Sequence, residues 1–319
     1  MPDIKTHGTV VITPIGEEDL GPHSAPPGDE TWQESWALAW HDPQTGAGGW
    51  HHIGLQRNRG FADVWNWIVA DGEVVGRYNN LRNPLPDHDF PDFAIAGMEI
   101  KNRSLRDLRL TSTYSSGARS ELEYSAYTDP FTIDLRPELI SMGSHHYESQ
   151  GRMTGTIVLP DGTETEVNAL AWADHSWGSR DWSQSLAHRW LQANFGPEAF
   201  ISVWQVMTHK GPVCAGYVYA DGAFHGVKSV TYDAGIHDDG YSPSRTTTSI
   251  WTDASIGFRI KGTVGTGVSV PHDAGFWMTD GLAIFEMGDR LGAGIFEVRE
   301  RSLLPAEAAS VHEEGAAAR

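Results

Sequence analysis

The sequence predicts an all-β protein built from two tandem antiparallel β-barrels packed side by side. Three observations support this fold class. The 319 residues include 35 glycines, and Asp-Gly turns recur between short runs rich in Val, Ile, Thr, Tyr and Trp. The interior of the chain contains no long amphipathic helical pattern. Finally, a hairpin sequence at residues 70–76 recurs at residues 220–226, which fits a duplicated unit of ordinary domain size.

The chain is expected to begin with an extended leader over residues 1–30. This segment is rich in Pro, Gly and acidic residues, and it should wrap the surface rather than enter the core. The N-terminal barrel is predicted over residues 31–165 and the C-terminal barrel over residues 166–304. Residues 305–319, full of Ala and Glu, form a tail that is either a short helix or a frayed end.

Two hairpins are predicted from alternating runs in the middle of the chain. Residues 105–113 and 120–128 form one alternating pair, and residues 152–159 and 163–171 flank the turn Pro160-Asp161-Gly162. Alternation of apolar and polar side chains is typical of strands with one buried face.

A short sequence in the first half of the chain recurs in the second half. Ala70-Asp71-Gly72-Glu73-Val74-Val75-Gly76 recurs as Ala220-Asp221-Gly222-Ala223-Phe224-His225-Gly226. An aromatic pair precedes each copy: Trp65 and Trp67 in the first, Tyr217 and Tyr219 in the second. A spacing of two places each pair on one face of a strand. We therefore expect the two barrels to be related.

The composition limits the partners of the protein. Lys and Arg total 23 against 42 Asp and Glu, a net charge of −19. Such a surface repels phosphate backbones and anionic lipid heads. We therefore expect no nucleic-acid partner and no peripheral membrane attachment, but a neutral, cationic or apolar small molecule. No apolar run approaches the roughly 18 residues that span a bilayer, so no stable membrane insertion is expected. The sequence leaves a homodimer open.

The N-terminus Met1-Pro2-Asp3-Ile4-Lys5 lacks the basic and apolar regions of a secretory signal. A cytoplasmic location is the simplest interpretation. The single cysteine, Cys214, excludes an intramolecular disulfide and a multi-thiolate zinc site. Its apolar neighbours favour a buried structural thiol.

The histidine pairs His51-His52 and His145-His146 raise the question of a metal site. Neighbouring residues on a strand point to opposite faces, so each pair offers one ligand per side at best. Neither pair has a spacing typical of metal ligands. We therefore predict no metal and no cofactor.

The segment from Ala173 to Trp182 is the strongest functional signal. It combines two carboxylates, Asp174 and Asp181, with His175 and two indoles, Trp177 and Trp182. Protonating an alkene carbon requires a carboxylic acid whose pKa is raised in an apolar pocket. Tryptophan faces stabilise the resulting cation. The other carboxylate or the histidine then acts as the base, so Asp174, His175 and Asp181 are the candidate catalytic residues.

The same residues also fit a structural role. Arg180 pairs with either neighbouring aspartate in that interpretation and pins the loop between the barrels, whereas in the functional one it contacts the substrate. Glu148 and Glu297 either reach the junction or are ordinary strand charges. Further tryptophans are expected to line a site for a flat or polycyclic ligand, or to fill the barrels: Trp65, Trp67, Trp190 and Trp204.

The segments Tyr147–Gly155 and Asp174–Trp182 together resemble the AttH/CrtC-like superfamily, which includes carotenoid 1,2-hydratase. The runs Gly292–Glu297 and Glu34–Trp36 are similar to further motifs of that group. The resemblance implies two lipocalin-like barrels with a hydrophobic ligand near their junction. It also implies that Asp174 donates the proton while His175 orients it or acts as base, or the reverse.

We therefore expect a metal-free lyase or isomerase of secondary metabolism. It would act as an acid–base hydratase, dehydratase or double-bond isomerase on an apolar terpenoid-, steroid- or polyketide-like molecule. Two alternatives remain open, a pericyclase and a non-catalytic protein that binds a hydrophobic ligand. The substitution Asp174→Asn separates them, because a general acid contributes roughly 10²–10⁴-fold to the rate.

Overall fold

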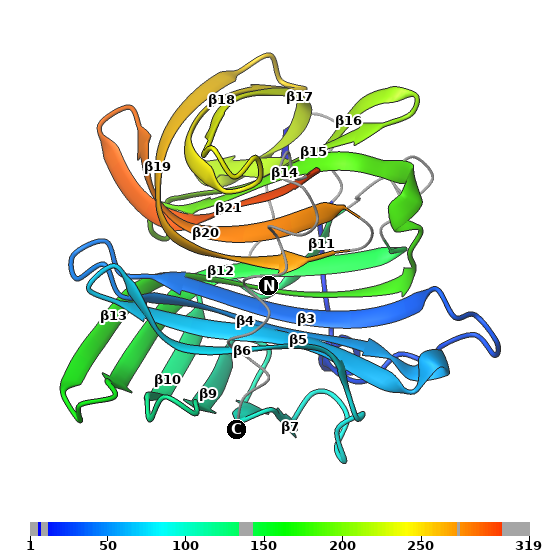
Figure 1. Ribbon diagram of the computed structural model, residues 1–319. Helices are drawn as coiled ribbons and strands as arrows, with labels where there is room; N and C mark the ends of the chain where they lie inside the picture. The colour runs from blue at the N-terminus through cyan, green and yellow to red at the C-terminus, as the bar shows by residue number, and fades with distance from the viewer. Residues whose placement is uncertain (1–5, 8–11, 134–142, 273–274, 302–319) are drawn as a thin grey trace.

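The computed structural model describes residues 6–7, 12–133, 143–272 and 275–301. These residues form 21 strands arranged in two sheets (Figure 1). The only helices among them are three short 3-10 turns: η1 (Glu17–Leu20), η2 (Arg57–Arg59) and η3 (Trp182–Gln184). Within the described segments, no helix has the length and apolarity needed to cross a membrane. The prediction of an all-β fold is confirmed.

The C-terminal sheet is a closed barrel. Its strands run in the order β17-β16-β15-β14-β21-β20-β19-β18, and β18 pairs back onto β17. Closure leaves no free sheet edge. Apolar side chains such as Leu191, Val203 and Phe296 fill its interior. The strands are β14 (Ser185–Asn194), β15 (Ala199–Thr208), β16 (Gly211–Ala220), β17 (Ala223–Ile236), β18 (Pro243–Thr252), β19 (Gly257–Pro271), β20 (Phe276–Met287) and β21 (Arg290–Arg301).

The N-terminal sheet has 12 strands and curls around its own core without closing. Its main order is β6-β5-β4-β3-β13-β12-β10-β9-β8-β7, and β11 pairs with β12 and β2. The strands are β2 (Ile12–Pro14), β3 (Trp32–His41), β4 (Gly48–Gln56), β5 (Phe61–Ala70), β6 (Glu73–Asn83), β7 (Phe93–Ile95), β8 (Met98–Asn102), β9 (Asp107–Thr113), β10 (Arg119–Ala126), β11 (Phe131–Ile133), β12 (His145–Val158) and β13 (Glu164–Ser179).

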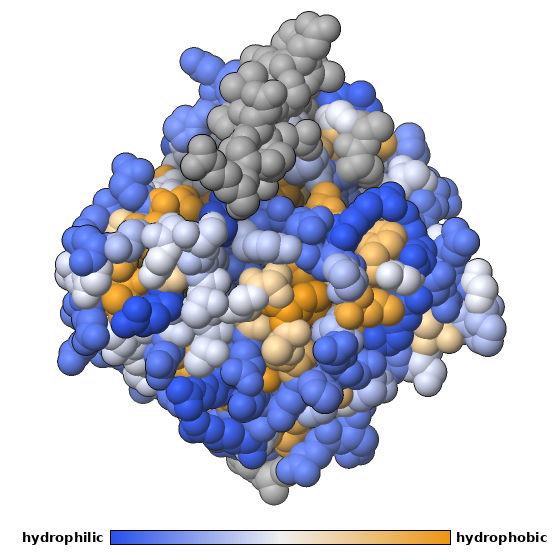
Figure 2. All heavy atoms as spheres, turned by 60° about the horizontal axis from the view of Figure 1, so that its bottom comes forward, coloured by the Kyte–Doolittle hydropathy of each residue, from blue (hydrophilic) through white to orange (hydrophobic). Residues whose placement is uncertain are grey.

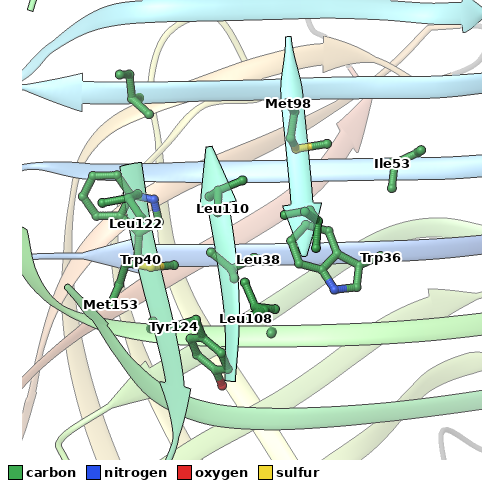
Figure 3. Packing of buried hydrophobic residues seen from close by; sticks show 14 of the residues in the cluster. Trp36, Leu38, Trp40, Ile53, Met98, Leu108, Leu110, Leu122, Tyr124 and Met153 are labelled. Atoms are coloured by element: carbon green, nitrogen blue, oxygen red, sulfur yellow. The ribbon is translucent and has the colours of Figure 1, made fainter. Parts of the chain in front are cut away.

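The core of this sheet lies inside the curl. Figure 3 shows Trp36, Leu38 and Trp40 of β3 packed with Leu110 and Leu122 from β9 and β10. Alternate side chains of β3 therefore point into the curl, and the residues between them point to the barrel.

The two sheets share one topology, as the internal repeat predicts. The order β6-β5-β4-β3-β13-β12 in the first sheet corresponds to β17-β16-β15-β14-β21-β20 in the second. The repeated hairpin sequences occupy equivalent places, between β5 and β6 and between β16 and β17. Both turns use two left-handed residues, Asp71 and Gly72 (φ 52° and 78°) and Asp221 and Gly222 (φ 53° and 74°). This is the pattern of a type I′ hairpin turn.

The chain passes from one sheet to the other after Ser179, later than the division at residues 165 and 166 that the sequence suggests. β13 completes the N-terminal sheet because it pairs with both β12 and β3. The predicted hairpins are present as β9–β10 and β12–β13.

The leader differs from the expected surface wrap. β1 (Thr6–His7) pairs in parallel with β17, and β2 pairs with β11, so the leader adds a strand to each sheet. Ile15 is buried. The predicted tail at 305–319 lies outside the described residues.

The outer wall of the barrel packs on the outer face of the N-terminal sheet (Figure 1). Small residues of β3, Ala37 and Ala39, face this junction. Aromatic residues from both sheets fill it: Trp50, Trp65, Trp67, Trp172, Trp190 and Trp204. Figure 2, turned to bring the lower side of Figure 1 forward, shows a mostly hydrophilic surface with some apolar residues near its centre.

Candidate active site

A cavity of about 490 Å³ lies between the two sheets. This volume is within the usual range for the site of one small molecule. Both sheets contribute aromatic rings to its wall: Trp50, Trp65, Trp182, Trp190 and Trp204. Trp190 and Trp204 meet edge to face, with ring centroids 4.2 Å apart. The cavity therefore offers flat apolar surfaces of the kind that the tryptophan pattern predicts.

Asp174 lines this cavity from β13. Asp174 is 6% exposed, and Nδ1 of His146 lies 3.8 Å from its Oδ2. Burial raises the pKa of Asp174 to about 7, and the negative charge of Glu148 adds to this, while His146 and Arg180 oppose it. Near neutral pH the Asp174 carboxyl group therefore keeps a proton for much of the time.

Glu148 lies directly across from Asp174 in the β12–β13 pairing, just behind the cavity wall. Three groups contact its carboxylate: His146 Nε2 at 2.9 Å, the hydroxyl of Ser202 at 2.8 Å and that of Tyr217 at 2.9 Å. Such a donor set suits a carboxylate, which only accepts hydrogen bonds. Two acids directly opposite each other normally destabilise a sheet, and here Glu148 favours the neutral form of Asp174.

The facing wall carries a second cross-strand pair of acids. Glu297 on β21 lines the cavity, and Asp280 on β20 lies opposite it in the pairing. Nε2 of His188 is 2.6 Å from Oε1 of Glu297, and Asp280 hydrogen-bonds to Glu297. Burial raises the pKa of Glu297 to about 7, with Asp280 opposing and Asp174 adding to the rise. Burial and the neighbouring Glu297 raise the pKa of Asp280 well above its ordinary value.

The two acid pairs occupy equivalent places in the repeated topology. Asp174 and Glu297 lie on β13 and β21, and their partners Glu148 and Asp280 lie on β12 and β20. Each partner is held by the opposite sheet. Ser202 and Tyr217 of the barrel donate to Glu148, and Nε1 of Trp65 in the N-terminal sheet donates to Oδ2 of Asp280 at 3.0 Å.

The mouth of the cavity is polar, because the exposed residues of its lining include Glu30, Arg59 and Arg82. Arg180 donates through Nη2 to the hydroxyl of Ser176 at 3.0 Å. Burial raises the pKa of Asp63 to about 6, although the hydrogen bond from Gln56 and the charge of Arg180 oppose it. His52 stacks on Trp65 with ring centroids 3.7 Å apart. This end of the cavity offers donors and acceptors for water or for a polar group of a ligand.

His175 points away from the cavity, into the curl of the N-terminal sheet. Its Nδ1 is 3.0 Å from the hydroxyl of Tyr147, and its Nε2 is 3.0 Å from Oε1 of Glu34. Successive residues of a strand face opposite sides, so Asp174 and His175 do not share a site. The expected roles of His175 as base or as orienting group for Asp174 do not fit this geometry.

The cluster around His175 ties the leader to the sheet. His23 Nδ1 lies 2.8 Å from Oε1 of Glu34, and Arg57 donates to its Oε2 at 2.6 Å. Burial alone would raise the pKa of Glu34, but the hydrogen bonds from His175 and His23 and the charge of Arg57 lower it to about 2. His23, Glu34 and His175 lie within 4.8 Å of one another and could hold a cation. Arg57 already neutralises Glu34, so the cluster is better described as a hydrogen-bonded anchor.

The structure brings together many of the residues that the sequence singles out. Those lining the cavity are Asp174, Arg180, Glu297, Trp182, Trp65, Trp190 and Trp204. Glu148 lies behind the wall, and Trp67 is buried in the junction without lining the cavity. The histidine pairs divide between faces as expected: His52 and His146 line the cavity and His51 does not.

Two members of the predicted cluster lie elsewhere. Trp177 stacks between His23 and His145, with centroids 3.5 Å and 5.1 Å away. Asp181 is exposed and accepts hydrogen bonds from Ser183 and Gln184, so it caps a turn. Cys214 is partly exposed rather than fully buried, and its thiol donates to the carbonyl of Lys228.

Sequence reasoning missed Asp280 and left open whether Glu297 reaches the junction or is an ordinary strand charge. Each is the only acid of a mostly apolar segment, Met278–Leu282 or Ile295–Val298. A lone carboxylate at an inward position of such a strand is costly to bury, and that cost is the signal that could have identified them.

Comparison with solved structures identifies the architecture. The AttH-like protein NE1406 from Nitrosomonas europaea superposes with a TM-score of 0.70 at 13% identity, covering 90% of this chain and 96% of that one. Kievitone hydratase from Nectria haematococca gives a TM-score of 0.64 at 15% identity, covering 94% and 97%. CghA, solved with Sch210972, gives 0.58 at 11%, covering 92% and 99%.

Identities this low establish the fold alone. The chain shares the fold of these proteins, and its closed barrel and curled sheet correspond to the two lipocalin-like units that its motifs predict. No curated protein matches the sequence. Over residues 16–302 the chain matches, and therefore belongs to, the family described as domain of unknown function DUF7064.

Proposed function

We propose that the protein is an acid–base enzyme that adds water to an alkene, removes it, or moves the double bond of an apolar small molecule held in the junction cavity. Asp174 supplies the proton. The observation that carries this proposal is a carboxyl group with a pKa of about 7, buried in a wall of tryptophans. Protonation of carbon needs an acid that stays neutral near physiological pH beside surfaces that tolerate a cation.

The residues that line the cavity suggest how the reaction would proceed. In the direction of hydration, the O–H proton of Asp174 is transferred to one alkene carbon, and the π electron pair forms the new C–H bond. The cation at the other carbon lies among the indole faces of Trp65, Trp190 and Trp204, an attraction of about 2 kcal/mol when desolvated. Water from the polar mouth attacks the cation and gives up a proton to a second group on the wall. Dehydration is the reverse.

The architecture supports this class of reaction. Kievitone hydratase has the same fold across 94% of this chain, and its name describes the addition of water. The substrate class that we propose is terpenoid-, steroid- or polyketide-like, because the cavity offers several flat aromatic surfaces.

Two alternatives make different demands on Asp174. A pericyclase needs shape and hydrogen bonds, and CghA, which was solved with the ligand Sch210972, has this fold. A binding protein needs only the aromatic cavity. Neither of them uses a buried neutral acid next to a carboxylate such as Glu148, so that pair favours acid–base chemistry.

The test is turnover in D₂O with a panel of probes: kievitone, geraniol and α-terpineol. Hydration of an alkene should add one water to the product, with deuterium as its carbon-bound hydrogen, read by mass spectrometry. Asp174→Asn should lower kcat/KM by roughly 10²–10⁴-fold. The matched control is Asp161→Asn, an exposed turn residue, which should leave the rate unchanged.

Three outcomes would contradict the proposal. Turnover in Asp174→Asn within about tenfold of the wild type would favour a pericyclase. Probe binding without any change of mass would favour a carrier protein. Loss of activity in Asp161→Asn would show that the effect of the Asp174 substitution is not specific to the cavity.

A further inference from the structure

The wall opposite Asp174 holds an acid pair that the proposed function leaves unexplained. Asp280 is 0% exposed and Glu297 4% exposed. Burying two carboxyl groups beside each other is costly unless they are hydrogen-bonded or share a proton. Only Glu297 reaches the cavity surface. The pair is therefore either a strained structural element or part of the site.

The contacts around the pair show how it distributes one proton. Oδ2 of Asp280 accepts from Nε1 of Trp65 at 3.0 Å, and its Oδ1 accepts from no group of the described residues. An oxygen without a donor fits an O–H group that donates to Glu297, with which Asp280 is hydrogen-bonded. Burial and the neighbouring Glu297 also raise the pKa of Asp280 well above its ordinary value, which favours Asp280 as the holder of the proton.

Glu297, in contrast to Asp280, is the hydrogen-bond acceptor of the pair. Nε2 of His188 lies 2.6 Å from its Oε1, and burial, with the charges of Arg299 and Arg189, lowers the pKa of His188 to about 3. In the neutral tautomer protonated at Nε2, His188 donates to this oxygen. Glu297 therefore receives two hydrogen bonds, from β14 and β20, and faces Asp174 of β13 across the cavity. Two donors favour its ionised form.

We propose that Asp280 and Glu297 form a proton-sharing dyad in which Glu297 is the catalytic base of the cavity, opposite Asp174. Asp280 and His188 are positioning residues that hold Glu297 ionised. The inference rests on the proposed function. In hydration, Asp174 gives its proton to carbon, and the attacking water, whose oxygen forms the C–O bond, loses one proton to Glu297. Net addition is one water, and exchange with solvent at the mouth returns the proton from Glu297 to Asp174.

The arrangement predicts a bell-shaped pH dependence of kcat/KM. Activity requires Asp174 protonated, which gives the falling limb above about pH 7, and Glu297 ionised, which gives the rising limb below about pH 7. The two limbs belong to different residues, so they test the two proposals separately.

The experiment measures the pH profile and the carboxyl titration of the same full-length variants. Glu297→Gln should lower kcat/KM for the turned-over probe by roughly 10²–10⁴-fold and remove the rising limb, whereas Glu286→Gln, an exposed change on β20, should do neither. In protein labelled with ¹³C at Glu side-chain carboxyls, one resonance should titrate near pH 7 and vanish in Glu297→Gln.

Two substitutions at Asp280 test the sharing of the proton. Asp280→Asn mimics the protonated acid, so it should leave the midpoint of Glu297 and the rising limb in place. Asp280→Leu removes the donor to Glu297. It should raise the titration midpoint of Glu297 and the pH of the rising limb by roughly one unit each. A lower midpoint in Asp280→Asn would mean that Asp280 is ionised in the wild type and would overturn the dyad.

Failures of the two proposals give different results. Retention of the rising limb and of activity in Glu297→Gln, while Asp174→Asn is inactive, would overturn the dyad alone. Absence of turnover with every probe would overturn the proposed function and the role of Glu297 as base, whatever the ¹³C titration shows.

Discussion

At the residue scale, the face on which a side chain lies decides its role. Asp174 and His175 are adjacent in the sequence, yet one lines the cavity and the other anchors Glu34 inside the curl. The sequence identifies the segment and its acid because unusual residue types are visible in it. It cannot assign the cavity face, since this depends on the packing of a barrel whose strands come later in the chain.

Asp174 should couple stability to pH. Its pKa is raised from 3.8 to about 7 in the folded protein, so the folded state binds more protons than the unfolded state between these values. The stability that the proton contributes is complete below about pH 3.8 and is lost as the pH rises through about 7, with a slope of about 1.4 kcal/mol per pH unit.

Asp174→Asn replaces the titrating carboxyl group with an amide, so the stability of the variant no longer falls as this group loses its proton. Urea denaturation should show that the free energy of unfolding of the variant, relative to the wild type, rises between about pH 5 and about pH 7 and then levels off. A difference that does not change with pH would contradict a raised pKa for Asp174.

His175 should contribute to stability rather than to chemistry. His175→Leu removes a hydrogen bond to buried Glu34, which should lower the free energy of unfolding by about 1–3 kcal/mol and leave the falling limb of the pH profile in place. Urea denaturation and kcat/KM with the active probe check this. A loss of kcat/KM as large as that of Asp174→Asn would return His175 to the catalytic site.

At the element scale, the register of the strand pairs determines which acids lie opposite each other. Glu148 faces Asp174 and Asp280 faces Glu297 because both hairpins, β12–β13 and β20–β21, fix their pairings locally. Asp-Gly turns and alternation made many of the strands predictable. The point at which the chain passes from one sheet to the other could not be predicted in this way. It depends on the pairing of β13 with β3, and β3 is distant in the sequence, so no local signal marks it.

Close approach of β15 and β16 should make one glycine indispensable. Gly216 has φ 125°, and a Cβ there would collide with the carbonyl oxygen of Ser202, which lies on the strand behind Glu148. Gly222, with φ 74°, has open space around it. Gly222→Ala should cost about 1 kcal/mol, and Gly216→Ala more, as measured by urea denaturation. Equal costs would contradict the tight contact.

At the scale of the whole molecule, the two sheets complete each other. Each supporting acid accepts at least one hydrogen bond from the opposite sheet, Glu148 from Ser202 and Tyr217, and Asp280 from Trp65. The aromatic cluster at the junction draws on both sheets as well. The site exists only when both are folded and docked, although net charge and composition gave no indication of such a shared interface.

This interdependence predicts cooperative unfolding. Differential scanning calorimetry should show one transition in which the calorimetric and van't Hoff enthalpies agree, because separating the sheets would expose the aromatic cluster and four buried carboxyl groups. Two resolved transitions would show that the barrel and the curled sheet are independently stable.

The ionisation of Asp174 is the claim on which the function depends. The most direct measurement is a pH titration of the protein labelled with ¹³C at Asp side-chain carboxyls, with the Asp174→Asn variant used to assign the resonance. We predict a midpoint of about 7 for Asp174. A midpoint near the ordinary value of 3.8 would leave the cavity without its proton donor at neutral pH and would contradict the proposed acid–base chemistry.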